Sequence, residues 1–586
     1  ESVYQRGIQL LVLNETPFAD KINILYHFMY LYTDRPELYY FMGWIYQSTG
    51  HPEIISIYWF TTALEKFMQY RKTCNQVHPY EIENWLDLLK ILFEANYTKK
   101  IQDILNTYSS IIQDYVTKKE ARIIHFLGAY YIKTNQLKRA QSMYQIILDP
   151  SFPKDQETEF QIQNNSLVLY SRMANFESLH DLLKRNLSIC QSMGSLPNVN
   201  EKTKRNLFCS NMLQYDYIYH DPEDRRQLCS SLVEKYYPTE PYRPSKTPPP
   251  PNKSNKLCIG YVSADFLHHA VSNFILPILE SHDVSNFCVV LFVCQYYEKF
   301  ATDPQFALIR NKCQLVNLEN VATDDAVRII RDEYHIDILF DLHGYTEKNR
   351  LDIFAKNPAP VQVTYLGFPN TVGSKNIVKY RITDAIADPV TSRQWWAEEL
   401  IRLDGGFLLF KSIALNQPIP YYKPYHPWIV FGSLNRESKN TPEVLECWKN
   451  ILDCTSHTKL LIKLSTIEDD DIHIENYLRK LGRETGPEKE RVIFAKYGSN
   501  EDYFKLFACI DILLDCFPYS GTTTTCNALF NSIPVITLRH PDLHSHNVSA
   551  SLLHHIGLDE LIADTPEEYV EKAVKLSMDS RRLLNI

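Results

Sequence analysis

The sequence predicts an α-helical domain followed by two α/β domains, each built on a parallel sheet. Three observations carry this prediction. The chain has 586 residues, too many for one hydrophobic core. Its 17 glycines divide unevenly, five in residues 1–240 and twelve after them, which indicates two different architectures. A proline-rich segment at 241–256 separates helical periodicity from short β-rich runs.

Residues 1–240 carry apolar side chains at helical spacing, as in Glu120–Lys133 and Leu137–Leu148. Two stretches share the same offsets of small and aromatic residues: Gly43, Tyr46, Gly50 and Trp59, then Gly128, Tyr131, Asn135 and Tyr144. These offsets resemble the tetratricopeptide repeat (TPR), in which a small residue lets two helices approach. The two matches are not separated by a whole number of repeats, so the repeats must be irregular; a generic helical domain is the alternative. A TPR-like solenoid would bind protein partners.

The segment at 241–256 contains four consecutive prolines, which exclude a helix and predict an extended linker. The β-rich runs after it are Leu257–Val262, Cys288–Val293, Ile336–Leu342, Val361–Leu366, Trp428–Leu434, Thr458–Leu464, Val492–Phe494, Ile510–Asp515 and Pro534–Leu538. They alternate with helical stretches such as Thr323–Tyr334 and Pro442–Ile451, which is typical of parallel sheets. A second proline-rich segment near 416–427 suits two Rossmann-like domains, 257–420 and 421–586. Ligands would bind beyond the carboxyl ends of their strands.

Composition narrows the function classes. Lys and Arg number 61 against 70 Asp and Glu, a net charge of −9, so the chain lacks the basic field of a nucleic-acid or membrane binder. The 13 cysteines show no C-x-x-C pair, which favours reduced thiols. No apolar run reaches the length of a membrane span. We expect a soluble cytoplasmic or nuclear protein with neither nucleic-acid nor membrane partners.

The strongest chemical signal follows the run Ile510–Asp515. A serine and a glycine precede four consecutive threonines at 522–525, and a helical run, Cys526–Phe530, comes next. Glycine frees the backbone, while threonine hydroxyls and first-turn N–H groups can hold a diphosphate. A simple helix cap would need only one threonine. Neither a dinucleotide-binding G-x-G-x-x-G motif nor a P-loop occurs in the chain.

A lysine occupies an unusual place in FGSLNRESKNTP, residues 431–442. Thr441 with Pro442 marks a helix start, so Lys439 lies just ahead of the positive end of a helix dipole. A cation is unfavourable there unless it meets an anion, and a diphosphate would supply one. A lysine with its head in water is the alternative.

A third candidate follows the first β-rich run, in GYVSADFLHHAVS at 260–272. Asp265 precedes His269 by four residues and could orient its imidazole for proton transfer, although both residue types also cap helices. The acidic run at 468–471 and the pair His544 and His546, at strand-face spacing, offer no complete ligand set, so we expect no metal.

Several segments resemble the protein O-GlcNAc transferase family in the same order: GYVSADFLHHAVSNF, LFDLHGYTEKNRLDIFAKNPAPVQVTYLGFPNTVGS, YRITDAIADP, FGSLNRESKNTPEVLECWKNIL and LDCFPYSGTTTTCNALFNSIPVITL. That family joins TPR repeats to a two-Rossmann (GT-B) glycosyltransferase, and the resemblance covers roughly residues 256–580. The segments PAPVQVTYLGFPNT, DCFPYSGTTTTC and HSHNVSASLL are more similar to the plant SPINDLY branch, protein O-fucosyltransferases that use GDP-fucose.

The resemblance implies residue roles. His269 matches the family's cleft histidine, with Asp265 as its partner, and Lys439 matches the lysine that neutralises the diphosphate. The expected donor-binding residues are Asn435, Lys439, Gly521, Thr522, Thr523, Thr524, Thr525, Asn527 and His546. Two departures concern the donor: Thr522 stands where O-GlcNAc transferases typically carry histidine, and Asn527 where relatives often carry an acid near the ribose.

The resemblance therefore implies an inverting, metal-independent protein O-glycosyltransferase. It would transfer fucose from GDP-fucose to Ser or Thr of intracellular proteins held by the TPR-like surface, with no cofactor beyond the donor. UDP-GlcNAc is the alternative donor, and an inactive scaffold that binds nucleotide or partners is the second alternative. A homodimer stays open, as does the question of whether His269 is the general base or an orienting residue.

Overall fold

The computed structural model contains two compact units, Glu1–Ile162 and Gln163–Ile586. It describes the whole chain except residues 1–3, 5–7, 9, 12–15, 135, 150, 151, 153–155, 174, 176, 177, 180, 184, 187–200, 219–225, 227, 228, 230, 231, 248–255, 268, 304, 305, 415–427, 465–471 and 497. Asn135, much of the linker, the acidic run and the second proline-rich segment therefore lie largely or wholly outside the described residues.

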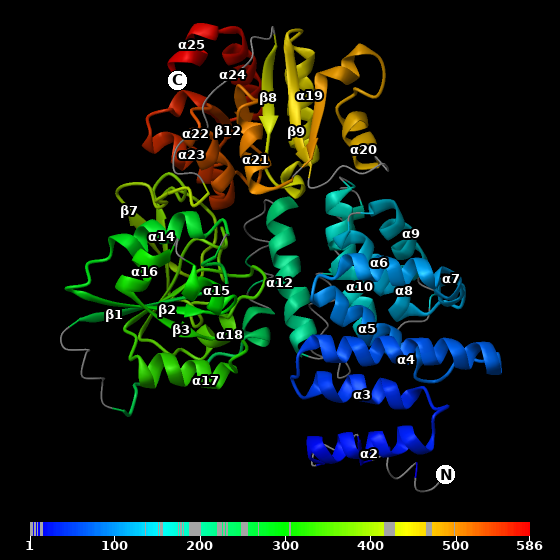
Figure 1. The fold of residues 1–586 in the computed structure, drawn as a ribbon. Helices are drawn as coiled ribbons and strands as arrows, with labels where there is room; N and C mark the ends of the chain where they lie inside the picture. Colours follow the sequence, from blue (N-terminus) through cyan, green and yellow to red (C-terminus); the bar gives the residue numbers. More distant parts are fainter. Residues whose placement is uncertain are drawn as a thin grey trace. The chain divides into compact units, whose positions relative to one another are not determined.

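The first unit is helical, as predicted (Figure 1). Its helices are α2 (Phe18–Leu31), α3 (Glu37–Ser48), α4 (Glu53–Cys74), α5 (Glu81–Glu94), α6 (Thr98–Thr107), α7 (Ser109–Thr117), α8 (Ala121–Lys133) and α9 (Leu137–Ile147). Helix α10 (Gln156–Arg172) continues into the second unit. The two helices predicted from periodicity are confirmed as α8 and α9.

Two helix pairs show why glycine recurs in this unit. A Cβ added to Gly43 on α3 would lie 2.6 Å from Cδ1 of Phe60 on α4. A Cβ added to Gly128 on α8 would lie 2.7 Å from Cε2 of Tyr144 on α9. Glycine thus permits close helix packing. The aromatic partner of Gly43 is Phe60 rather than the neighbouring Trp59, because one residue rotates the side chain to another helix face. The repeat assignment itself stays a prediction.

Residues 163–240 belong to the same compact unit as the sheets. Asn370 donates its amide to Asp216 of α12 (Glu201–Ile218) at 2.8 Å. The Tyr237 hydroxyl donates to Asn349 Oδ1 at 3.2 Å, and the ring centroids of Phe208 and Tyr345 lie 5.4 Å apart. The compact units therefore divide earlier than the predicted boundary at 241–256, because these buried side chains complete the loops of the first sheet.

In the described part of the chain, the first sheet has seven parallel strands in the order β3-β2-β1-β4-β5-β6-β7. They are β1 (Leu257–Ser263), β2 (Phe287–Val293), β3 (Cys313–Asn317), β4 (Ile338–Asp341), β5 (Val361–Thr364), β6 (Tyr380–Asp384) and β7 (Glu399–Leu403). Strands β1, β2, β4 and β5 confirm the sequence prediction. The sequence prediction missed β3, β6 and β7: β3 and β7 form the sheet edges, and all three carry polar side chains at alternate or terminal positions.

Helices cover both faces of this sheet. Helices α14 (Ser272–Ser281) and α16 (Ala307–Lys312) lie on one face and α17 (Thr323–Arg328) lies on the other (Figure 1). The predicted helix at 323–334 is thus confirmed as α17 with its π-helical continuation η4 (Ile329–Glu333). The remaining described helices of this domain are α15 (Tyr297–Thr302) and α18 (Leu351–Ala355).

Among the described residues, the second sheet has six parallel strands in the order β10-β9-β8-β11-β12-β13. They are β8 (Ile429–Ser433), β9 (Thr458–Leu464), β10 (Val492–Lys496), β11 (Ile512–Leu514), β12 (Val535–Leu538) and β13 (Ile562–Ala563), and only β13 was not predicted. The helices are α19 (Pro442–Asp453), α20 (Ile472–Lys480), α21 (Asn500–Phe507), α22 (Thr523–Phe530), α23 (His544–His555), α24 (Pro566–Met578) and α25 (Ser580–Asn585), with the short helical turns η5 (Glu437–Lys439), η6 (Pro487–Arg491) and η7 (Asp559–Leu561). The predicted two-sheet (GT-B) architecture is confirmed.

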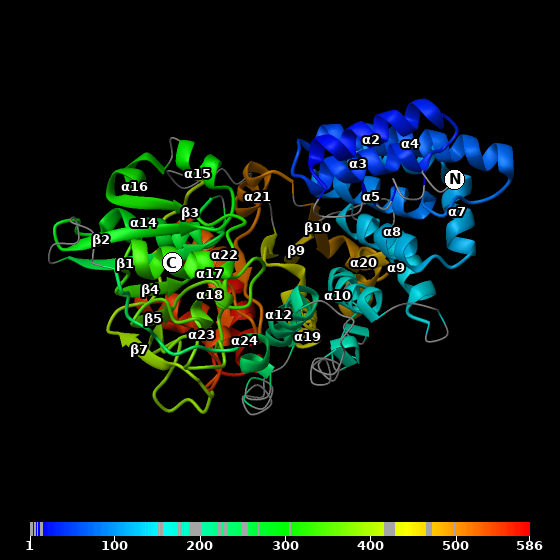
Figure 2. The ribbon, with the colours of Figure 1, turned by 90° about the horizontal axis from the view of Figure 1, so that it is seen from below.

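The strand-like spacing of His544 and His546 was misleading, because both residues lie in helix α23. His544 and His546 were placed at strand-face spacing, but they begin a helix. This helix lies against the β6–β7 end of the first sheet domain in two perpendicular views (Figures 1 and 2). None of the helices in the described residues combines the length and the hydrophobicity that a membrane crossing requires.

Candidate active site

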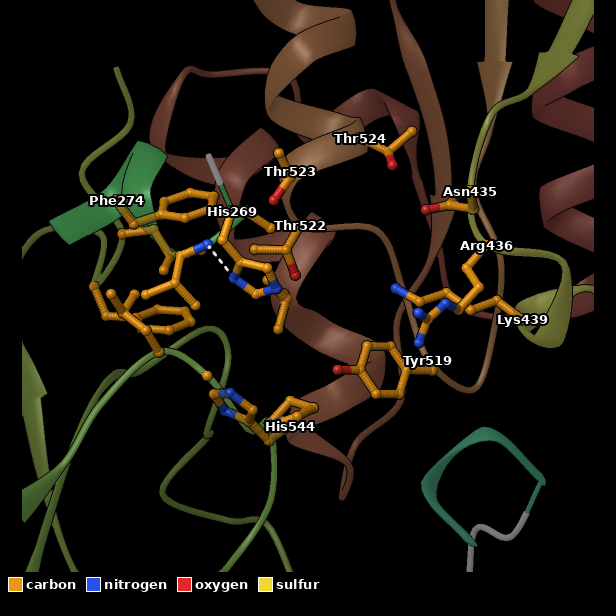
Figure 3. Close-up of a pocket in the computed structure, with 18 residues that line it drawn as sticks. His269, Phe274, Asn435, Arg436, Lys439, Tyr519, Thr522, Thr523, Thr524 and His544 are labelled. Atoms are coloured by element: carbon orange, nitrogen blue, oxygen red, sulfur yellow. Dashed lines mark hydrogen bonds between the residues drawn. The ribbon is translucent and has the colours of Figure 1, made fainter. Parts of the chain in front are cut away.

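Residues from both sheet domains line one pocket of about 270 Å³. In Figure 3, Asn435, Arg436, Lys439 and Tyr519 lie at one end and His269 and Phe274 at the other, with Thr522 between them. The other lining residues are Ala270, Val271, Leu366, Gly367, Pro369, Phe407, Leu408, Thr523, Thr524, His544 and Val548. Loops that follow β1, β5, β8 and β11 thus meet at the pocket, as the rule for open parallel sheets requires.

A buried carboxylate holds the threonine-rich loop. Asp515 follows β11, and its Oδ1 accepts the N–H of Gly521 at 2.7 Å and the amide of Asn435 at 3.2 Å. Its Oδ2 accepts the Thr537 hydroxyl at 2.8 Å. A Cβ on Gly521 would lie 2.4 Å from Thr525 Oγ1, so the loop needs glycine at this place. The loop is therefore fixed before any ligand binds.

Three of the four threonines face the pocket. Helix α22 begins at Thr523, earlier than the predicted run Cys526–Phe530, and no side chain caps its N-terminus. Thr522, Thr523 and Thr524 line the pocket beside that helix start. Thr525 does not: it is buried, and its hydroxyl pairs with Ser549 Oγ of α23 at 2.8 Å. The loop thus offers hydroxyls and first-turn N–H groups to an anion, while its last threonine fastens it to α23.

Lys439 lies at the end of the helical turn before α19, whose cap is Thr441, as predicted. The Lys439 ammonium donates to the carbonyl of Ser520 at 2.8 Å and lies 4.0 Å from the ring centroid of Tyr519. Burial lowers the pKa of Lys439 to about 8, although Asp515 opposes that change. A poorly solvated cation that faces the threonine-rich loop is suited to an anionic ligand.

His269 and Asp265 form the predicted pair. His269 Nδ1 accepts the N–H of Val271 at 3.3 Å and lies 3.4 Å from Asp265 Oδ2, so the neutral ring carries its proton on Nε2 in this arrangement; the side chain is 48% exposed. Burial lowers the pKa of His269 below its ordinary value, and Asp265 opposes this. The lowered pKa favours the neutral imidazole at neutral pH. To accept a proton at Nε2, that ring must carry its own proton on Nδ1, where Asp265 lies 3.4 Å away.

A second histidine, His343, to which the sequence analysis assigned no role, lies behind this pair. His343 Nε2 accepts the N–H of Ala264 at 2.7 Å, so the neutral ring carries its proton on Nδ1. That nitrogen lies 3.0 Å from Thr346 Oγ1 and 3.6 Å from Asp265 Oδ2. Asp265 thus lies between two imidazoles. A histidine-glycine step directly after a strand was the only sequence signal for this arrangement.

Four predicted donor-binding residues are not part of the pocket lining: Gly521, Thr525, Asn527 and His546. His546 stacks on the rings of Phe517 and His540, with centroids 5.8 and 5.5 Å away. Asn527 is buried, and its carbonyl accepts the amide of Asn531 at 2.7 Å. Their contacts with the donor stay predictions. In the residues that the structure describes, no group of three or more His, Cys, Asp or Glu is arranged to hold a metal ion.

Two parallel-sheet domains that share one pocket, here with a threonine-rich helix start and a buried lysine, place the chain in the GT-B fold class. Within that class, the chain belongs to glycosyl transferase family 41, whose model matches residues 223–417 and 411–586.

Relatives and a solved structure agree with this assignment. The chain is 34% identical over 394 residues to the "Probable UDP-N-acetylglucosamine--peptide N-acetylglucosaminyltransferase SPINDLY" of Solanum lycopersicum. The aligned region covers 65% of this chain and 41% of that protein. It is 28% identical over 345 residues to the corresponding SEC protein of Arabidopsis thaliana, covering 56% of this chain and 34% of that protein. A lysine-to-methionine mutant of the Thermobaculum terrenum O-GlcNAc transferase aligns with a TM-score of 0.68 and 26% identity, over 85% of this chain and 90% of that chain. The chain spans less than half the length of these curated relatives.

Proposed function

We propose that the protein transfers a sugar from a nucleotide donor to Ser or Thr hydroxyls of other proteins, with inversion at the anomeric carbon. One observation carries the proposal: the Lys439 ammonium lies on the carbonyl of Ser520, in the threonine-rich loop, across one pocket from His269. The pocket thereby joins an anion-binding end to an end with a neutral base.

Charge stabilisation at the anion-binding end would support the leaving group. When the bond between sugar and diphosphate breaks, negative charge grows on the diphosphate oxygen. The Lys439 ammonium and the first-turn N–H groups of α22 are fixed in position before this happens, which is the condition for efficient electrostatic stabilisation. These residues of the chain can meet that charge without a metal ion.

The opposite end would serve the acceptor. A Ser or Thr hydroxyl attacks the anomeric carbon from the face opposite the diphosphate, and its proton passes to the imidazole of His269. One carbon–oxygen bond forms, another breaks, and the nucleoside diphosphate leaves with the bonding electrons. His269 would act as the base or orient the hydroxyl, and Asp265 would support the charged imidazolium.

For the donor we propose GDP-fucose, which the resemblance to the SPINDLY branch implies. The identity of 34% to a SPINDLY protein against 28% to a SEC protein supports that branch. UDP-GlcNAc is the second candidate, because the printed names of both relatives carry UDP-N-acetylglucosamine. We further propose cytoplasmic or nuclear proteins as acceptors, held by the helical unit.

The deciding experiment incubates the chain separately with each donor and with acceptor peptides or a cell extract, and weighs the products by mass spectrometry. Addition of fucose supports the proposed donor. Addition of N-acetylglucosamine would show that the donor is UDP-GlcNAc and not GDP-fucose. Lys439→Ala is the control, since product that depends on this chemistry should fall to a small residual level in that variant. If no donor tested gives transfer or hydrolysis, the enzymatic proposal is overturned and the inactive scaffold is favoured.

A further inference from the structure

We infer that His544 is a positioning residue for this transfer reaction, which acts on Lys439 through α23 and Ser520. The inference rests on the proposed function, and it adds a residue that contacts the first sheet domain yet belongs to the second. His544 lines the pocket (Figure 3), but its two ring nitrogens both contact residues outside the pocket lining.

The hydrogen bonds of His544 determine its tautomer. Nδ1 lies 2.7 Å from Asp388 Oδ2, and Nε2 lies 3.4 Å from a terminal nitrogen of Arg381. Because a guanidinium can only donate, Nε2 accepts, and Nδ1 carries the proton toward the carboxylate. The ring therefore has no lone pair left for a substrate proton, so it holds structure and does not act as a base.

The two partners of His544 on the first sheet domain are deeply buried. Arg381, on β6, and Asp388 are each 1% exposed. Burial alone would raise the pKa of Asp388, but His544, Thr383 and Arg381 together lower it below its ordinary value. Removing the imidazole would take from this buried charge the first-named of its three stabilising groups and leave only Thr383 and Arg381, an unfavourable change.

The backbone at the start of α23 is held by the same domain. The N–H of His544 donates to Gln394 Oε1 at 2.7 Å. Just ahead of the helix, the guanidinium of Arg393 donates to Asp542 at 2.7 and 3.0 Å. The position of the helix start is therefore set by the segment between β6 and β7.

The next residue of α23, Ser545, is connected to Lys439 by hydrogen bonds through Ser520. The carbonyl of Ser545 accepts both the N–H and the hydroxyl of Ser520, each at 2.9 Å. The carbonyl of Ser520 accepts the ammonium of Lys439 at 2.8 Å. His544 is thus the immediate neighbour of the residue that holds the loop beneath Lys439. If the imidazole is lost, the helix start keeps only its backbone hold by Gln394 and the pair of Arg393 and Asp542, so we expect Ser545 to shift. A shift of about 1 Å in a positioning group can lower a rate by about 100-fold.

The experiment compares steady-state kinetics of His544→Leu and His544→Asn in the full chain. We expect His544→Leu to lower kcat by about 10- to 100-fold, with the donor KM changed by less than about threefold, because Lys439 acts mainly on charge that develops in the transition state. Asparagine keeps an N–H donor for Asp388 and should recover most of kcat. His555→Asn is the matched control: it alters another histidine of α23, 3.9 Å from Asp384 of the first sheet domain, but far along the helix from Ser520, and should leave kcat unchanged.

A double-mutant cycle separates positioning from general stability. In the Lys439→Ala background, His544→Leu should cause no further loss of the residual turnover. An independent, additive loss would overturn the inference, as would a wild-type kcat for His544→Leu. If that variant does not fold, Gln394→Ala removes the acceptor of the His544 N–H together with an amide that donates to Asn370 at 3.1 Å, and an unchanged kcat there also counts against the inference. Turnover by the wild type tests the proposed function separately.

Discussion

At the scale of single residues, the unusual property of Lys439 is its lowered pKa. Burial is the main cause of a pKa of about 8; the nearby cations Arg436 and Lys463 lower the pKa further, whereas Asp515 and Cys516 oppose the change. A lysine must be protonated to neutralise a diphosphate, and protonation is lost as pH rises through that value. We expect kcat/KM, which reports the free enzyme, to fall above about pH 8.

Arginine at this place tests the assignment. Arg stays charged at every accessible pH, so Lys439→Arg should keep some activity and lose the alkaline decline. A pH–rate profile of both proteins measures this. An identical decline in Lys439→Arg would assign the alkaline limb to another group.

His269 predicts the acidic side of the same profile. The groups around it are Asp265, which raises its pKa, and His343 and Arg436, which lower it further below the ordinary value. A base must be neutral, so activity should be lost as pH falls through this lowered pKa. Removing the carboxylate charge in Asp265→Asn lowers the pKa of His269 again, and the acidic limb should move to lower pH. A limb that stays in place in Asp265→Asn, or survives in His269→Ala, would exclude His269 as the base.

Gly521 tests whether the loop must be fixed. A Cβ there would lie 2.4 Å from Thr525 Oγ1 and 2.9 Å from Asp515 Oδ1. Relief of such overlap costs about 1–3 kcal/mol, so Gly521→Ala should lower kcat/KM by about 10- to 100-fold. Gly405→Ala is the control, because nothing lies within 4 Å of a Cβ there. Equal kinetics for the two variants would show that the loop adapts.

At the scale of elements, helix packing in the first unit depends on a missing side chain. Gly128→Ala places a Cβ 2.7 Å from the Tyr144 ring, between α8 and α9. Alanine favours helix by about 1 kcal/mol, but overpacking costs about 1–3 kcal/mol, so we expect a net loss of stability. Differential scanning calorimetry of the full chain measures it.

A smaller side chain in place of Tyr144 provides the control for Gly128→Ala. If the clash is the cause, Tyr144→Leu should destabilise the native chain and yet reduce the effect of Gly128→Ala. Additive losses would place the cause in the helix itself and not between the helices.

The strands and helices also show which sequence signals were sufficient to predict an element and its bounds. Strands β1, β8 and β9 were predicted nearly to the residue, because inner parallel strands are rich in apolar residues, even where two lysines interrupt the run in β9. Strand β7, at the edge, alternates exposed and half-buried residues and gave no such run. Helix α23 begins with polar residues that are nevertheless buried, so its start could not be recognised from hydrophobicity.

At the scale of the whole molecule, residues before the linker complete the catalytic part. A chain that begins at residue 156 keeps α10 and α12, whereas one that begins at residue 241 removes the partners of Tyr345, Asn349 and Asn370. We expect the longer chain to unfold in one cooperative transition and the shorter one to melt several degrees lower or aggregate. Similar melting curves would place the functional boundary at the linker.

The sequence by itself determined the helical and two-sheet architecture, the threonine-rich loop, Lys439, and the pair of Asp265 and His269. Each depends on neighbours close in the chain, such as a strand that ends before a loop or a proline that starts a helix. Only the tertiary structure decided that Thr525 turns away from the pocket, that His343 supports Asp265, and that His544 joins the two sheet domains. These contacts join residues 24, 78 and 156 positions apart, and burial and hydrogen-bond partners at such separations arise only when the chain has folded.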